Sequence, residues 1–505
     1  MIGLEIGVLI IAAVLSAHVL IKAPIRREIL AHQVLAVVAL AIVLTGVAGL
    51  VHLSLRVNAV RHTSVGLVAL AAILALWRAR PQYGCQRGLP PGSLGLAASL
   101  DAIDDPTFYA QATKRWGTVF KMSQVHRPVA CIADIAVAQD LFRSQEDALT
   151  QSQWSFNRLV PGGYLEYMRG EPHARYRALL SAALAPATIE ASRAVMRSVA
   201  THHLMELSAA SRTAGVNPEP FLLPVAMSSL LFAVLGVAPA HERSASLEAL
   251  FTDLARPMEL YLPVPRRMRA TYQALLTEVR ALGNASGAAD RLPPLSVLAE
   301  LLQQEPAALN DETLAGNLIL MVKEGSIMVR GLLRWVLKML CDHPEWAERL
   351  REASGDSARF GTLARHFVLE TLRLHESRYV YRVATRDLSV GPFRIPRGWL
   401  VRLCLGEAHE RKDRFVEPHT FNPQRFATRA PGSDHFAPFG HGRHACLGAD
   451  LTLAIAQEFL HEAVLHFDVS TVADGPPWRI NRHWGLWRPS QQWRVASVPR
   501  TPART

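Results

Sequence analysis

Three uncharged runs near the N-terminus restrict the structures that this chain can adopt more than any other feature of the sequence. They span Ile6–Ile21, Ile29–Leu55 and Thr63–Trp77, and the second continues for 27 residues. A helix needs about 20 apolar residues to cross the hydrocarbon of a bilayer, so the second run predicts a span. The first run is adequate with its N-terminal extension, and the third is marginal. The sequence therefore predicts a membrane anchor of two or three transmembrane helices in residues 1–84.

The basic residues beside these runs predict the orientation of the anchor. Each run is followed by positive side chains, namely Lys22, Arg26, Arg27, Arg56, Arg61, Arg78, Arg80 and Arg87. Positive residues prefer the cytoplasmic side, and the start of the chain lacks the basic segment of a cleaved secretory signal. We expect a multi-pass membrane protein whose catalytic domain, residues 85–505, faces the cytoplasm. The 5 cysteines lack pairing-like spacing, which agrees with a reducing compartment.

The composition of the remaining chain excludes several classes of protein. Half of the residues are apolar and 19% are charged, which argues against disorder and coiled coil. The net charge is +11, but the arginines are dispersed and no basic stripe with interleaved aromatics occurs, so no nucleic-acid partner is expected. The pattern predicts a mainly α domain with a small β-sheet. A hairpin is expected at Gly117–Ser123 and Arg127–Ala133, and a long buried core helix at Glu312–Leu340.

A glycine-rich loop near the C-terminus, Phe436–Gly448, carries the strongest chemical signal. Its glycines at 440, 442 and 448 let the backbone pass close to a flat cofactor, and Cys446 stands where a helix begins. Backbone N–H groups and the helix dipole favour a thiolate there, which predicts a lowered pKa for Cys446. Taken alone, the cysteine could also be a small buried hydrophobe.

The loop resembles the haem-binding loop of the cytochrome P-450 family. The shared pattern is Phe439-x-x-Gly-x-His444-x-Cys446-x-Gly, in the variant with histidine two residues before the cysteine. The resemblance implies a cytochrome P-450 fold preceded by N-terminal transmembrane helices, and haem b with Cys446 as axial thiolate ligand of the iron. It also implies that His444 contacts a haem propionate and that Phe439 lies against the proximal face of the ring.

Further motifs follow in the order of that family. Glu370-x-x-Arg373 and the later Arg425 match its buried ion triad, which supports the haem loop without doing chemistry. The resemblance implies three more propionate ligands. These are His173 and Arg177, which a four-residue spacing puts on one helical face, and Arg382.

The long central helix departs from the family pattern. The family carries an acid followed by an alcohol that relay protons, but Ile327 and Met328 occupy these positions and neither can carry a proton. One hypothesis is that Glu324 and Ser326 are the catalytic substitutes. The other is that the enzyme does not use O2 and instead handles a peroxide, or rearranges or dehydrates its substrate. The sequence leaves both open.

The expected function is haem-dependent monooxygenation of a lipophilic small molecule in a biosynthetic pathway. No Gly-x-Gly-x-x-Gly follows a strand, so electrons are expected from a separate ferredoxin or flavoprotein reductase. The alternatives are a haem-thiolate isomerase, dehydratase or peroxygenase, and a non-catalytic haem-binding sensor. The substrate, the redox partner and the oligomeric state stay open.

Overall fold

The computed structural model describes the greater part of the chain after residue 87. The described residues are 88–94, 101–102, 105, 107–124, 127–151, 159–255, 266–284, 295–375, 379–428, 435–473, 478–479, 487–488 and 492–497. The expected transmembrane helices in residues 1–84 lie outside these ranges. Across the described ranges, no helix combines the length and the apolar character that a membrane span requires.

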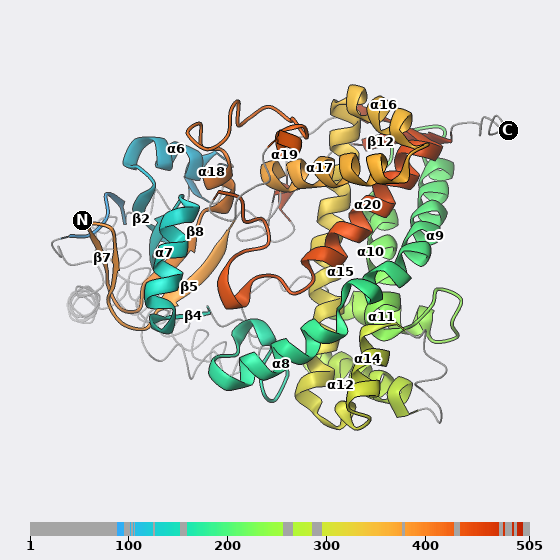
Figure 1. The fold of residues 1–505 in the computed structure, drawn as a ribbon, viewed down its shortest axis with the longest axis horizontal. Coiled ribbons are helices and arrows are strands. Elements are labelled where there is room, and N and C mark those ends of the chain that lie inside the picture. Colours follow the sequence, from blue (N-terminus) through green and yellow to red (C-terminus); the bar gives the residue numbers. More distant parts are fainter. Residues whose placement is uncertain are drawn as a thin grey trace, which may run out of the picture.

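One end of the molecule is built on a six-stranded sheet with the order β1-β2-β3-β8-β5-β4 (Figure 1). Its strands are β1 (Gly92–Ser93), β2 (Val119–Gln124), β3 (Arg127–Ile132), β4 (Leu149–Gln151), β5 (Val380–Ala384) and β8 (Leu400–Leu403). Strands β2 and β3 form the predicted antiparallel hairpin, and β8 pairs with β3 in parallel. The sheet therefore joins the start of the domain to a segment about 270 residues later, which brings β5 into the site described below.

Three two-stranded ladders complete the β-structure. They are β6 (Leu388–Val390) with β7 (Phe393–Ile395), β9 (Phe467–Ala473) with β12 (Gln492–Ser497), and β10 (Trp478–Arg479) with β11 (Trp487–Arg488). Helix α6 (Phe108–Trp116) and helix α7 (Ile135–Gln145) accompany the sheet. Asp134 begins α7 as a cap, because its side chain accepts hydrogen bonds from the N–H groups of Ala136 and Val137.

The other end is helical. Its longer helices are α8 (Gly170–Ala183), α9 (Pro186–Ala210), α10 (Glu219–Leu235), α11 (Ser244–Leu254), α12 (Arg266–Asn284), α15 (Glu312–Asp342), α16 (Pro344–Ala353), α17 (Ser357–His375) and α20 (Ala449–His466). The shorter ones are α14 (Val297–Gln304), α18 (Leu405–His409), α19 (Arg425–Thr428), and the 3-10 turns η1 (Glu146–Ala148), η3 (Leu165–Tyr167), η4 (Ala308–Asn310) and η5 (Gly442–His444). The mainly α fold with a small sheet is confirmed.

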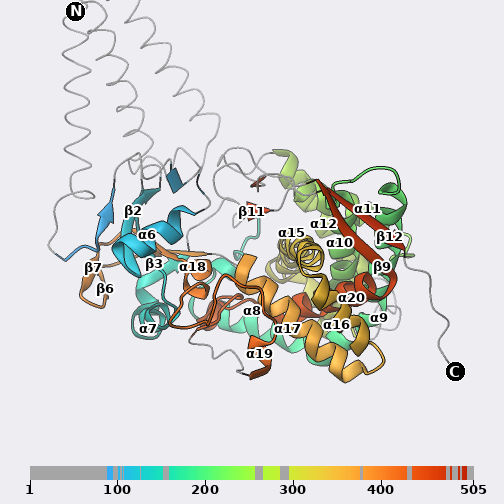
Figure 2. The ribbon, with the colours of Figure 1, turned by 90° about the horizontal axis from the view of Figure 1, so that it is seen from above.

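Helix α15 runs through the helical end and is seen end on in Figure 2. It packs against α10, α12, α17 and α20. Asp311 caps its start by accepting from the N–H groups of Thr313 and Leu314, and leucine, isoleucine and valine fill its buried faces. The prediction of a core helix here is confirmed, and the largest hydrophobic cluster of the protein surrounds it.

Candidate active site

The segment before α20 passes between the sheet and the helical end and presents Cys446 (Figure 1). Gly440 and Gly442 have φ values of 75° and 70°, in the left-handed region that favours glycine. The N–H of Cys446 donates a hydrogen bond of 2.8 Å to the carbonyl of Phe439, which closes the loop and fixes the cysteine three residues before α20. The backbone therefore holds the sulfur at the start of a helix, as the sequence predicts.

The electrostatics of this sulfur differ from the prediction. The pKa of Cys446 is raised, because desolvation outweighs the hydrogen bond from the Gly448 N–H and the nearby Arg177 guanidinium, both of which lower it. The backbone N–H lowers the pKa of Cys446 as predicted, but the predicted net lowering is wrong, because the surrounding protein removes water that would stabilise a thiolate. Cys446 nevertheless has accessible surface. Its accessibility combined with desolvation means that the surrounding protein crowds the sulfur without covering it.

Two histidines meet beside the cysteine loop. His173 on α8 is 2% exposed, and its ring centre lies 4.2 Å from that of His444 in η5. The pKa of His444 is lowered to about 3, first by burial and then by His173 and neighbouring arginines. Nε2 of His173 and Nδ1 of His444 are buried without a hydrogen-bond partner among the described residues. Such orphaned polar atoms are costly in a folded protein and call for a ligand.

Two arginines converge on the same place from other elements. Arg177, one turn after His173, donates to the carbonyl of Ala445 at 2.9 Å. Arg382 on β5 is 6% exposed and donates to Gln151 Oε1 at 2.6 Å, and burial lowers its pKa to about 10. Across the described residues, neither arginine forms an ion pair. Arg382 is buried and Arg177 is partly buried, and removing a cation from water without a direct ion pair is unfavourable, so this group suits an anionic ligand such as a haem propionate.

The predicted triad lies behind this loop. Arg373 donates to both carboxylate oxygens of Glu370, each at 2.8 Å, and Arg425 Nε donates to Glu370 Oε1 at 2.9 Å. The Glu370 and Arg373 side chains are fully buried. Arg373 also donates to the carbonyls of His409 and Pro418, which ties α17 to the segment that leads into the cysteine loop. This network is structural, and the prediction of a buried triad is confirmed.

Helix α15 separates the two residues that the sequence suggested as proton carriers. The Glu324 carboxylate accepts from Lys323 Nζ at 2.6 Å and is 41% exposed, and Lys323 is almost fully buried. Ser326 is fully buried, and its hydroxyl donates to the Lys323 carbonyl at 2.9 Å. Two residues along a helix turn the side chain by about 200°, so Glu324 and Ser326 face different ways. The structure does not bring them together.

Other positions of α15 show which face is open. Met328 is 41% exposed although it lies in the interior of a buried helix. It is four residues after Glu324, so the two share a face. Gly325 lies on the face of α15 that packs against α10, since a Cβ there would lie 3.0 Å from Leu230 of α10. Glu324 therefore stands on the open face of α15, and Ser326 stands on the packed side.

One further titratable residue near this face was missed by the sequence analysis. Glu166 lies in η3, and its pKa is raised to about 7 by burial and by the Glu324 carboxylate, while Arg382 and Lys323 lower it. It has accessible surface despite this desolvation, like Cys446. No motif surrounds Glu166 in the sequence, so only its tertiary neighbours reveal it.

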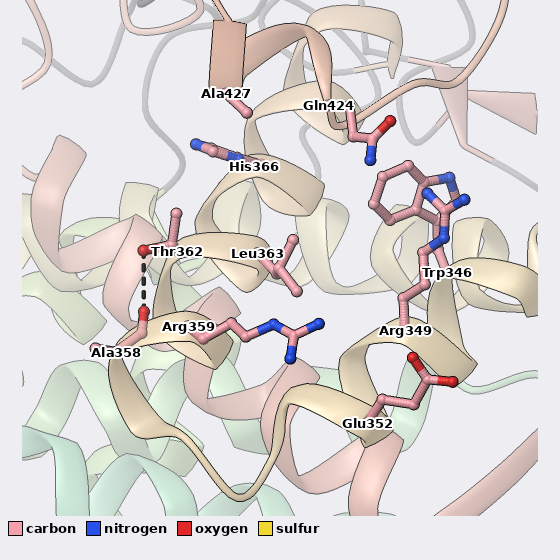
Figure 3. Close-up of a pocket in the computed structure, with 10 residues that line it drawn as sticks. All are labelled: Trp346, Arg349, Glu352, Ala358, Arg359, Thr362, Leu363, His366, Gln424 and Ala427. Carbon is pink, nitrogen blue, oxygen red and sulfur yellow. Dashed lines mark hydrogen bonds between the residues drawn. The ribbon is translucent and has the colours of Figure 1, made fainter.

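A separate cavity of about 590 Å³ lies between α16, α17 and α19 (Figure 3). It is lined by Trp346, Arg349, Glu352, Ala358, Arg359, Thr362, Leu363, His366, Gln424 and Ala427. The Arg349 guanidinium lies 4.7 Å from the centre of the Trp346 ring. This cavity shares no residue with the cysteine site, and its charged rim is predominantly basic.

Comparison with known proteins agrees with this geometry. Residues 103–496 match the family described as Cytochrome P450. The rice (Oryza sativa subsp. japonica) protein named abscisic acid 8'-hydroxylase 3 is 26% identical over 466 residues, covering 82% of this chain and 89% of the rice protein. The taxane 13-alpha-hydroxylase of Taxus cuspidata is 24% identical, covering 80% and 90% respectively.

A solved structure shares the fold. The retinoic-acid-bound cyanobacterial CYP120A1 superposes with a TM-score of 0.66 at 20% identity, covering 81% of this chain and 99% of its own. The family match spans nearly the whole described part, and its members include named hydroxylases. Family membership implies a haem whose iron is held by a cysteine thiolate. This chain belongs to the cytochrome P450 family and is a P450-type oxidoreductase.

Proposed function

We propose that this protein is a haem-thiolate monooxygenase in which Cys446 is the iron ligand. The observation that carries the proposal is the meeting of Cys446 with two histidine nitrogens and two arginines. Among the described residues, the nitrogens have no hydrogen-bond partner and the arginines form no ion pair. These residues come from three separate segments, namely α8, β5 and the cysteine loop, and together they suit a flat dianionic cofactor. When bound, haem with an axial thiolate supplies the oxygen chemistry that hydroxylates unactivated carbon.

Different residues of this chain are proposed to contact different parts of the cofactor. His173, Arg177, Arg382 and His444 bind the two propionates and offset the cost of their own burial. Phe439 packs against the main hydrophobic cluster, its carbonyl accepts from the N–H of Cys446, and its ring is proposed to lie against the proximal face of the haem. Because the protein alone raises the pKa of Cys446, a bound iron would supply the positive charge that favours the thiolate.

The substrate is proposed to be apolar and uncharged over most of its surface. The named relatives act on abscisic acid and on taxanes, and the solved neighbour binds retinoic acid. All three ligands are built on isoprenoid skeletons, so terpenoid-like molecules are the first substrates to assay. The open face of α15 supports an apolar ligand through Met328, which replaces the alcohol of the family.

Electrons are proposed to come from a separate ferredoxin or flavoprotein reductase. The family match fills residues 103–496, which leaves no room there for a flavin or nicotinamide domain. The basic rim of the cavity between α16 and α19 would attract an acidic carrier. The anchor in residues 1–84 is proposed to hold the domain on the cytoplasmic side of a membrane, where an apolar substrate would be concentrated.

A carbon monoxide difference spectrum of the reduced protein tests the proposal. Wild-type protein is expected to give the band of a thiolate-ligated haem, and Cys446→Ser is expected to lose it and to lose turnover. Cys341→Ser is the matched control, because Cys341 lies on α15 away from the loop. Haem content and spectrum unchanged in Cys446→Ser would refute the assignment.

A second candidate is haem-thiolate chemistry without the O2 and reductase cycle. Ile327 and Met328 favour it, because the usual proton carriers are absent from these positions. It predicts turnover with a peroxide, or with an already oxygenated substrate, in the absence of reductase. Parallel assays with reductase, with peroxide and with neither separate the two candidates.

A further inference from the structure

The backbone that carries Glu166 is fixed tightly against α15. Buried Asn317 on α15 accepts from the N–H of Leu165 at 2.7 Å, and its amide donates to the carbonyl of Gly163 at 3.3 Å. A Cβ on Gly162 would lie 2.5 Å from Thr313 Oγ1, so the loop touches α15 at the closest approach that glycine allows. Glu166 therefore has a defined place beside the helix.

The surroundings of Glu166 come from four elements. Within η3 and its approach they are Tyr164 and Tyr167; from α15 they are Glu324 and Lys323; from β5, Arg382; and from the cysteine loop, Cys446. Glu324 lies in an ion pair with Lys323, whereas Glu166 has neither a hydrogen bond nor an ion pair among the described residues. The two carboxyl groups are close enough for each to affect the titration of the same neighbours.

Glu166 and Glu324 are placed beside the part of α15 where the acid and alcohol of the family are absent. Glu324 stands one turn before Met328 on the open face of α15. It also follows Asn317, which holds the η3 backbone, by seven residues, or about two turns, so that Asn317 and Glu324 lie on the same side of the helix. A carboxyl that holds a proton near neutral pH is a suitable general acid, and the raised pKa of Glu166, about 7, meets that need. The Glu324 side chain is 41% exposed, so it is in contact with water.

We propose that Glu166 and Glu324 together form the proton-delivering carboxyl pair of this enzyme, in place of the acid and alcohol absent at 327 and 328. The inference rests on the proposed monooxygenase function. That reaction consumes O2, two electrons from the reductase and two protons, and yields hydroxylated product and water. Glu166 releases its O–H proton into the pocket, becomes a carboxylate, and regains a proton from water that reaches it past Glu324.

Infrared spectroscopy of the haem-loaded protein tests the pair without relying on turnover. Wild-type protein is expected to show a protonated carboxyl band that titrates near pH 7. Glu166→Gln should lack this band, and the shift of its titration in Glu324→Gln should reveal the coupling. Glu171→Gln is the matched control, since Glu171 is an exposed carboxylate at the start of α8. A band unaffected by Glu166→Gln overturns the proposal.

Product yield per electron pair provides the second readout. Glu166→Gln is expected to lower the coupling of electron use to product at least roughly tenfold with little change in KM, and Glu166→Asp should recover much of it. Coupling in wild-type protein should fall as the pH rises through about 7, and this dependence should vanish in Glu166→Gln. Coupling and pH profile equal to wild type in Glu166→Gln would overturn the pair.

Adding Met328→Thr to Glu166→Gln tests whether the loss of coupling in Glu166→Gln is a loss of proton delivery. The new hydroxyl would stand on the open face of α15, at the position of the family alcohol, and should restore part of the coupling. If product forms and no variant changes the coupling, the proposal of a proton-delivering carboxyl pair is refuted and the monooxygenase proposal stands. If wild-type protein gives no product with reductase or peroxide, the monooxygenase proposal fails and the pair fails with it.

Discussion

The cysteine side and the α15 side of the site follow the family pattern to different degrees. On the cysteine side, His173, Arg177, Arg382 and His444 meet around the Cys446 loop as the motifs predict. On the α15 side, the acid and alcohol of the motif are absent, and the Glu166 carboxyl of η3 lies near enough for the Glu324 charge to raise its pKa. Holding an iron and two carboxylates demands particular residues at fixed places, whereas an acid can deliver a proton from any element within reach.

The largest expected effect tests the support of the cysteine side. Glu370→Gln leaves Arg373 and Arg425 without their buried counter-charge, so the free energy of unfolding should fall by about 3–5 kcal/mol. Urea unfolding measures the change. Glu190→Gln is the control, because its pair with Arg193 is exposed and should matter by under about 1 kcal/mol. Equal stability of the two variants would show that the triad is dispensable.

The next largest effect concerns the affinity of the protein for haem. Arg382→Met removes a buried charged donor, so the affinity for haem should fall about ten- to hundredfold, equivalent to roughly 1.5–3 kcal/mol. Haem transfer to an acceptor protein measures this loss. Arg386→Met, which breaks only an exposed pair with Asp147, should retain haem like wild type. Similar haem loss in both variants would argue against a propionate contact at Arg382.

A third prediction tests how closely η3 is held to α15. Gly162→Ala places a methyl group 2.5 Å from Thr313 Oγ1, so unfolding should become easier by about 1–3 kcal/mol. Adding Thr313→Ala should recover part of the loss, because it removes the atoms that collide. Gly355→Ala is the control, with no atom within 4 Å of its added Cβ. An unchanged melting temperature in Gly162→Ala would mean that the loop is not fixed there.

The smallest effect is the pH dependence of stability from Glu166. Its pKa in the folded protein, about 7, exceeds its ordinary value of 4.5, so the folded state binds the proton more strongly than the unfolded state. The stability from this group is complete below about pH 4.5 and is lost as the pH rises through about 7. Urea unfolding of wild type and Glu166→Gln across this range should differ in slope. Identical slopes would place the group in water.

Much of the fold follows from local patterns in the sequence. The hairpin of β2 and β3, the core helix α15 and the triad of Glu370 are where the spacing predicts. The motif residues around Cys446 were also within reach, because each motif is short and contiguous. Ser326 was not, since the face of a helix that packs against α10 depends on segments about 100 residues away.

The sequence alone determined which residues gather around the Cys446 loop, because iron and propionates accept few ligand types and these recur at fixed spacings. Only the tertiary structure decided in which direction the pKa values of these groups shift and which other carboxyl group lies near Glu324. The raised pKa values of Cys446 and Glu166 arise from desolvation, which depends on the atoms that distant segments bring together. The residue type alone, cysteine or glutamate, does not show how far the folded protein will bury the side chain.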